Sequence, residues 1–190
     1  MVGGVDCSYT KSRSFAAIVI LAYPELKVIE KVFASVRTSF PYIPGLLSFR
    51  ELPAIIKAYK KLSNIPDLTF VDGHGIIHPR KIGIATHLGL ILKKPTIGIA
   101  KHKFVATFDR LPIEVGEYIK AYVGGEFRGY VYKSKKNCNP IYISPGNLIT
   151  IEESLNFTLT CMGKYKLPLP VQYAHMYSEV VKNVQPNFQS

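Results

Sequence analysis

The order of apolar and polar positions predicts three strands and then a helix in the first third of the chain. Three β-branched, apolar segments cover residues 2–8, 15–23 and 26–36, and their short polar connections are typical of antiparallel hairpins. Between residues 51 and 62, apolar side chains recur at the helical spacing i, i+3, i+4 and i+7. We therefore expect a three-stranded meander that leads into a helix.

The rest of the chain alternates between strands and helices. Strands are predicted at residues 68–71 and 96–100 around a helix at 82–92, which favours a right-handed crossover. A strand pair at 118–132, a short strand at 141–144 and helices at 150–162 and 171–184 follow, and residues 185–190 are expected to fray. This order predicts one α/β domain over residues 1–190. Its fold would be a ribonuclease H-like mixed sheet, with three antiparallel strands and then parallel strands, flanked by helices.

Composition narrows the class of protein. The chain has 190 residues, 47% of them hydrophobic, enough for a full core. Its 24 Lys and Arg against 13 Asp and Glu give a formal net charge of +11, which makes nucleic acid the leading candidate partner.

The cysteines and the apolar runs predict where the protein is located. The three cysteines lack a close pair and fit a reducing cytoplasm. The longest apolar run is too short for a membrane span, so we expect a cytoplasmic monomer without a leader or a membrane partner.

A group of polar residues follows the strand predicted at 68–71. It comprises Asp72, Gly73, His74, Gly75, His78 and Arg80. Open α/β sheets bind ligands at the carboxyl ends of their strands, so this segment would face a crevice. Gly73 would let the backbone approach a base closely, and His78 and Arg80 would contact a base or a phosphate. An ordinary Asp-Gly turn is the alternative.

Two aspartates form a candidate metal site. Asp6 stands in the middle of the first predicted strand, where aspartate is disfavoured. In a ribonuclease H-like sheet the first and fourth strands are neighbours, so Asp6 and Asp72 would meet. Mg²⁺ prefers oxygen ligands and often uses one or two carboxylates. A backbone cap or an ion pair between Asp6 and Lys101 is the alternative.

Glu51 is the third acidic candidate. Ser48 and Glu51 have the spacing of a capping box, but Pro53 would then fall in the second turn of the helix. Proline is tolerated at the first helical position. We therefore expect the helix to begin at Pro53 and Glu51 to lie in front of it, free to face the site.

Three stretches of the sequence together resemble the endonuclease V family. They are Gly4-Val5-Asp6-x-Ser8-Tyr9, Pro41-Tyr42-Ile43-Pro44-Gly45-x-Leu47-Ser48-Phe49-Arg50-Glu51-x-Pro53 and Val71-Asp72-Gly73-x-Gly75-x-x-His78-Pro79-Arg80-x-x-Gly83-x-Ala85-x-His87-x-Gly89, with weaker matches at Ile143-Ser144-Pro145-Gly146 and Pro170-x-x-x-Ala174-His175. The resemblance implies a Mg²⁺-dependent DNA repair endonuclease, with Mn²⁺ as a substitute, that recognises deaminated bases, chiefly deoxyinosine. Cleavage would fall at the second phosphodiester bond 3′ to the lesion and leave a 3′-hydroxyl and a 5′-phosphate. Inosine-containing RNA stays open as a second partner.

The resemblance also implies roles for single residues. Asp6 and Asp72 would be the metal ligands, Glu51 would complete a catalytic acidic cluster, and Lys101 would be a catalytic lysine. The prolines on either side of Tyr42 and Ile43 hold that loop stiff, and by the resemblance Tyr42 is a wedge that enters the base stack. Without the resemblance, this loop is a rigid turn with a buried tyrosine.

One position departs from the family pattern. The family is expected to place a histidine near the metal after Gly146, and here Asn147 stands instead. An amide cannot shuttle a proton near neutral pH. This leaves open a protein that binds inosine-containing nucleic acid without cutting it. A small-molecule α/β enzyme with an accidental glycine-rich turn is the third reading.

Overall fold

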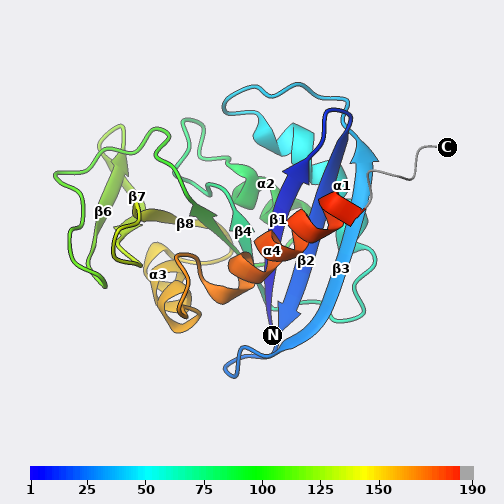
Figure 1. Ribbon diagram of the computed structural model, residues 1–190. Coiled ribbons are helices and arrows are strands. Elements are labelled where there is room, and N and C mark those ends of the chain that lie inside the picture. The colour runs from blue at the N-terminus through cyan, green and yellow to red at the C-terminus, as the bar shows by residue number, and fades with distance from the viewer. Residues whose placement is uncertain (185–190) are drawn as a thin grey trace.

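One mixed sheet of eight strands organises the fold, in the order β3-β2-β1-β4-β5-β8-β7-β6 (Figure 1). The computed structural model describes residues 1–184, so the predicted fraying of residues 185–190 lies outside the described residues. The strands are β1 (Val2–Tyr9), β2 (Arg13–Leu21), β3 (Val28–Arg37), β4 (Leu68–Asp72), β5 (Thr96–Ala100), β6 (Tyr118–Val123), β7 (Glu126–Tyr132) and β8 (Ile141–Asn147). The first three are antiparallel, and β4 and β5 run parallel to β1. The predicted antiparallel meander, the parallel strands after it and the adjacency of the first and fourth strands are therefore confirmed.

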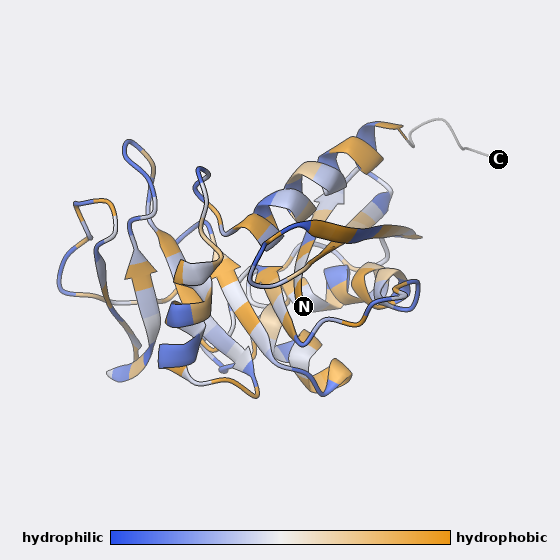
Figure 2. Ribbon diagram, turned by 90° about the horizontal axis from the view of Figure 1, so that it is seen from below, coloured by the Kyte–Doolittle hydropathy of each residue, from blue (hydrophilic) through white to orange (hydrophobic). Residues whose placement is uncertain are grey.

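Helices cover both faces of the sheet. The helices are α1 (Leu47–Tyr59), α2 (Ile84–Leu92), α3 (Ile151–Thr160) and α4 (Leu169–Val184). One core cluster joins β-strand residues such as Phe70 to α3 and α4, and another joins Val71 to α1 and α2. Successive strand residues point to opposite faces, so these central strands are buried on both sides, as their nearly continuous apolar sequence predicted. Figure 2 shows hydrophobic colour along these strands and hydrophilic stretches in many of the loops.

Helix α1 corrects one prediction. It begins at Leu47, so Pro53 lies inside the helix and Glu51 is a helical residue rather than one that precedes it. Pro53 is exposed, so the backbone carbonyl that loses its helical donor can be hydrated instead of being buried without a partner. Ser48 does not cap the helix. Its hydroxyl lies 3.0 Å from Nδ1 of His87.

Strand register brings the two predicted aspartates together. Val5 of β1 pairs with Val71 of β4 in parallel register, so Asp6 and Asp72 are the next residues on adjacent strands. Helix α4 lies across β1 and β2 (Figure 1). A Cβ atom at Gly4 would lie 1.9 Å from the Pro170 carbonyl oxygen, so only glycine lets the start of α4 come this close to the strand. Among residues 1–184, no helix has the length and apolar character needed to cross a membrane.

Candidate active site

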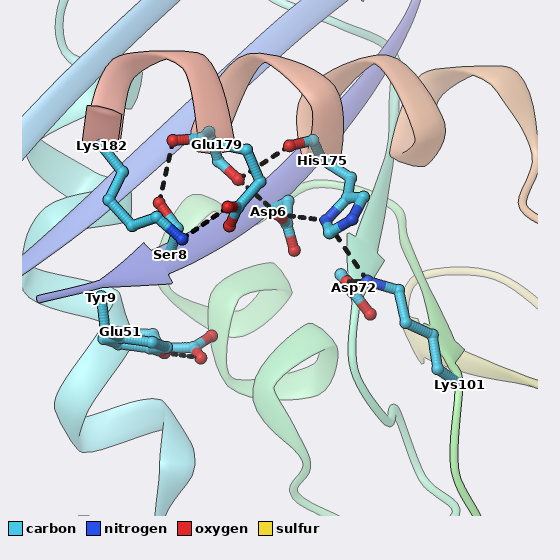
Figure 3. A network of polar contacts seen from close by, with 10 residues as sticks. Asp6, Ser8, Tyr9, Glu51, Asp72, Lys101, His175, Glu179 and Lys182 are labelled. Atoms are coloured by element: carbon cyan, nitrogen blue, oxygen red, sulfur yellow. Dashed lines mark hydrogen bonds and ion pairs between the residues drawn. The ribbon is translucent and has the colours of Figure 1, made fainter. Parts of the chain in front are cut away.

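Asp6, Asp72 and His175 form a compact cluster where β1, β4 and α4 meet. One ligand atom from each of the three residues lies within 4.8 Å of the other two. Nδ1 of His175 lies 3.1 Å from Oδ2 of Asp6, and the Ser178 hydroxyl donates a 2.6 Å hydrogen bond to the same oxygen. Figure 3 shows Asp6 between α4 and Asp72, with the imidazole of His175 beside both carboxylates. Helix α4 therefore supplies two polar side chains that hold the strand carboxylate.

The two carboxyl groups titrate as a pair. Burial alone would raise the pKa of Asp6, but hydrogen bonds with His175 and Asp72, among others, lower it to about 2. Burial, followed by the contact with Asp6, raises the pKa of Asp72 to about 7. The pair therefore holds one proton over much of the range below neutral pH, because two adjacent buried carboxylates resist ionising together. A divalent cation bound between them would remove this penalty.

Lys101 and Glu51 flank the cluster. The Lys101 ammonium forms an ion pair with Asp72, and not with Asp6, the partner that the alternative to a metal site would require. Glu51 is 6% exposed and accepts a hydrogen bond from the Tyr9 hydroxyl. Burial, then the charges of Asp6 and Asp72, raise the pKa of Glu51 well above its ordinary value. The structure thus brings together the four residues predicted to be catalytic.

One cavity of about 340 Å³ includes both the carboxylates of Asp6 and Asp72 and a recess lined by Gly45, Gly73 and Phe104. Asp6, Asp72, Glu51 and Lys101 line one part, and the loop of Tyr42 lines another. The remaining lining residues are Cys7, Pro44, Gly45, Leu47, Ser48, Gly73, His74, His78, Ile82, Gly83, Ile84, Ala100, His102, Lys103 and Phe104. This volume lies within the ordinary range of ligand pockets, and its walls mix apolar groups with a few polar ones.

The predicted nucleic-acid contacts occupy different environments. Tyr42 is 68% exposed at the cavity rim, and Gly73 lines the cavity with a φ of 141° that favours glycine. His78 is only 4% exposed and packs against Phe104, with ring centroids 5.8 Å apart. Burial lowers the pKa of His78, which favours the neutral imidazole in the wall of the cavity. Arg80 is exposed and donates a 3.1 Å hydrogen bond to the Gly45 carbonyl, which braces the neighbouring loop.

Asn147 does not belong to the site. It pairs with Thr96 at the start of β5, whereas Lys101 follows the opposite end of that strand. Its amide donates hydrogen bonds of 3.0 and 3.2 Å to the carbonyls of Gly89 and Lys94. The histidine expected near the metal is therefore not required at position 147, because His175 of α4 lies beside the carboxylates. Asn147 therefore gives no reason to expect a protein that binds inosine-containing nucleic acid without cutting it.

His175 and Ser178 were missed as site residues, although His175 lay in the weakest part of the family pattern. Ala174 and Ser178 are fully buried on α4, and His175 lies on the same side of the helix at its margin. A histidine and a serine three positions apart are uncommon on the packed face of an amphipathic helix, because that face is usually apolar. That local signal could have indicated α4 as a wall of the site.

The donor set of the cluster fits a hard divalent cation. Two carboxylates suit Mg²⁺ and Mn²⁺, and the imidazole nitrogen adds a ligand that Mn²⁺ accepts more readily. We expect saturating Mg²⁺ or Mn²⁺ to raise the thermal unfolding midpoint by about 5 °C, because a ligand at about 100 times its Kd adds about 2.7 kcal/mol. Differential scanning fluorimetry against EDTA measures the shift. The variant carrying Asp6→Asn and Asp72→Asn should show no shift, and an equal shift in that variant would place the ion elsewhere.

Comparisons with known proteins match the chain over nearly its whole length. The family model described as Endonuclease V matches residues 1–176. An endonuclease V of Petrotoga mobilis is 42% identical over 182 residues, which cover 96% of this chain and 82% of that protein. The crystal structure of endonuclease V from Bacillus subtilis has a TM-score of 0.91 at 36% identity, covering 96% of this chain and 81% of that one. Endonuclease V of Ciona intestinalis, solved with a 24-mer DNA containing an inosine followed by a ribo-adenosine, has a TM-score of 0.83 at 26% identity, covering 97% and 87%.

Proposed function

The chain belongs to the endonuclease V family and is a nuclease, and from this premise we propose that it cuts DNA beside deaminated bases, chiefly deoxyinosine. Cleavage would fall at the second phosphodiester bond on the 3′ side of the lesion and leave a 3′-hydroxyl and a 5′-phosphate. The relative from Ciona intestinalis was solved with inosine-containing DNA, which supports DNA as the partner. We further propose a cytoplasmic location, which the free cysteines Cys7, Cys138 and Cys161 support, and a monomeric state.

The observation that best supports cleavage beside a deaminated base is that one continuous cavity contains both a recess and the carboxylates. The recess bounded by Gly45, Gly73 and Phe104 opens into the same space as the carboxylates of Asp6 and Asp72. A base that leaves the stack could occupy the recess while the backbone of the same strand passes over the carboxylates. Recognition and cleavage would then occur in one cavity but at different nucleotides, which is consistent with a cut beside the lesion and not at it.

The residues around the carboxylates have separable tasks. Asp6, Asp72 and His175 would hold Mg²⁺ or Mn²⁺, and the bound cation would supply neutralisation of the charge that develops on the phosphate. Ser178 and His175 keep the Asp6 carboxylate oriented through their hydrogen bonds to Oδ2. The Lys101 ammonium stands beside Asp72, where it can anchor a phosphate oxygen.

Glu51 is suited to handle a proton. Its carboxyl group is buried on α1, and burial together with the charges of Asp6 and Asp72 raises its pKa well above the ordinary value, which favours the protonated form. The Tyr9 hydroxyl donates to Oε1 and fixes the orientation of the group. A carboxyl group in such a position can exchange a proton with water or with a leaving oxygen.

Tyr42 would separate the strands at the lesion. Aromatic stacking on a base contributes about 1–3 kcal/mol, which is comparable to the cost of unstacking a weakly paired base. We expect Tyr42→Ala to lower the cleavage rate on an inosine-containing duplex by about tenfold to a hundredfold, and to affect single-stranded DNA less. Single-turnover assays on matched duplex and single strands measure the difference. Tyr42→Phe should retain duplex cleavage, and an equal loss on both substrates would contradict the wedge role.

An incision assay tests the proposed function directly. Matched DNA strands carrying deoxyinosine or deoxyguanosine at one position, and an RNA strand carrying inosine, are incubated with the protein and Mg²⁺ or Mn²⁺. Sequencing-gel analysis and end-group chemistry identify the cleaved bond and the products. The expected result is a Mg²⁺-dependent nick on the 3′ side of deoxyinosine and no nick in the matched deoxyguanosine strand. Binding without a nick under every metal condition would refute the proposal.

A further inference from the structure

Five lysines lie in two neighbouring loops outside the cavity of the active site, and none of them has a role in the mechanism above. The β7–β8 loop carries Lys133, Lys135 and Lys136, and the loop between α3 and α4 carries Lys164 and Lys166. We call these five residues the lysine track. Lys135, Lys136 and Lys164 are exposed, and the other two are partly buried.

The topology places the track at the same end of the sheet as the carboxylates. Tyr132 at the end of β7 pairs with Ile141 at the start of β8, and Tyr142 pairs with Ala100 at the end of β5. The β7–β8 loop therefore emerges at the end of the sheet where Lys101 follows β5. Burial lowers the pKa of Lys166, and the nearby charges of Lys101 and Asp72 act on it in opposite directions. Lys166 thus lies within electrostatic range of the active site.

Hydrogen bonds hold the two loops together. The Ser134 hydroxyl donates a 2.6 Å hydrogen bond to the Lys166 carbonyl, which joins one loop to the other. The Lys133 ammonium donates a 2.6 Å hydrogen bond to the Cys138 carbonyl and closes its own loop. The two loops are therefore braced against each other, which fixes the part of the surface from which the five lysines extend.

The charge of the track is not compensated. Within residues 1–184, none of its five lysines takes part in an ion pair with a carboxylate. On α4, at the other side of the cluster, Lys182 is paired with Glu179. A row of uncompensated lysines next to a phosphate-cleaving site matches a phosphodiester backbone, which carries one charge per nucleotide.

We propose that the lysine track binds the backbone of the substrate on the 3′ side of the cleaved bond. This inference rests on the proposed function, because it takes the lesion base to occupy the recess beside Tyr42 and Phe104. The recess and the carboxylates share one cavity, and the lysines of the track are absent from its lining. We take a strand that runs from the recess over the carboxylates to continue past Lys101 onto the track, because the β7–β8 loop emerges at the end of the sheet where Lys101 follows β5. The part of the substrate that the track binds would therefore be the segment on the 3′ side of the cleaved bond.

Binding measured against salt concentration tests the track. Each lost phosphate contact should reduce the slope of log K against log salt by about 0.9 on duplex DNA. We expect a variant with Lys135→Gln, Lys136→Gln and Lys164→Gln to bind a deoxyinosine duplex with a long 3′ flank on the order of tenfold more weakly at low salt, with a shallower slope. On a duplex trimmed just past the cleavage site, variant and wild type should bind alike. Fluorescence anisotropy in EDTA keeps the strand intact.

A matched triple variant provides the control. Lys27, Lys60 and Lys93 are exposed and lie near the opposite end of the sheet, and their replacement by Gln removes the same charge without changing the slope. Equal slopes for wild type and track variant on the long duplex would overturn the proposal. So would an equal loss on the long and trimmed duplexes, or an equal loss in the control variant. The single variants Lys135→Gln and Lys164→Gln should each remove part of the slope.

The incision assay separates this proposal from the one it rests on. If the wild-type protein cuts the deoxyinosine strand but the track variant keeps the full slope, only the track is wrong. If the wild-type protein cuts nothing, the proposed function fails whatever the slopes show.

Discussion

Asp72→Asn is expected to abolish cleavage while leaving a folded protein that still binds DNA. The amide keeps the shape of the side chain but removes the charge that would bind a cation beside Asp6, and it cannot keep the ion pair with Lys101. A bound metal ion contributes several kcal/mol to stabilising the transition state, and 1.36 kcal/mol corresponds to a factor of ten. The cleavage rate should therefore fall by at least about a thousandfold. Single-turnover assays with Mg²⁺ measure it.

The matched control for this prediction is Asp109→Asn. Asp109 is an exposed aspartate that lies outside the cavity of the active site, so its loss should leave the cleavage rate within about twofold of the wild type. Circular dichroism and DNA binding in EDTA show whether Asp72→Asn is folded and competent to bind. An Asp72→Asn protein that is folded and cuts at near the wild-type rate would remove Asp72 from the proposed cation site.

Gly4→Ala is the second large expected effect, and it acts through packing. The added Cβ would lie 1.9 Å from the Pro170 carbonyl oxygen and 2.8 Å from the Val171 nitrogen, both backbone atoms that no rotamer change can move. Overpacking a core usually costs about 1–3 kcal/mol, and a backbone clash belongs at the upper end of that range or beyond. We expect a loss of about 3 kcal/mol in the free energy of unfolding, measured by urea denaturation.

The same substitution should also impair the active site. Helix α4 would have to move away from β1, and His175 and Ser178 would then lose their hydrogen bonds to Asp6. Cleavage should therefore fall even under conditions in which the variant is fully folded. Gly3→Ala is the matched control, since its Cβ would meet only side-chain atoms, the nearest being Pro66 Cγ at 3.0 Å. Comparable losses in the two variants would contradict the close approach of α4 as the cause.

Most of the fold could be predicted because its signals are local. Strand and helix periodicities reflect which side chains are buried within a few residues, and the predicted strand at residues 96–100 agrees with β5 at both ends. Errors lay at element boundaries. At the start of α1, proline chemistry suggested a later beginning, but burial of Ser48, Glu51 and Leu52 on one face of the helix outweighs the cost of an exposed Pro53.

The site was predictable in part, for a related reason. Asp6 and Asp72 were conspicuous because a charged residue in or at the end of an apolar strand needs a compensating partner. A charge within an apolar run is visible in a few residues of sequence. His175 gave a weaker signal, since a histidine on an amphipathic helix has many ordinary explanations. The contact of His78 with nucleic acid stays a prediction, and its burial beside Phe104 was not predictable because that ring belongs to a loop from another part of the chain.

By itself, therefore, the sequence determined the elements, their order and the two strand aspartates, because hydrophobic periodicity and misplaced charge can be read within a few residues. Only the tertiary structure decided that α4 brings His175 and Ser178 to Asp6, that Asn147 lies at the far end of β5, and that lysines from two loops lie side by side. These contacts join segments far apart in the chain. They depend on strand register and on how closely a helix can cross a sheet, which no short window of sequence contains.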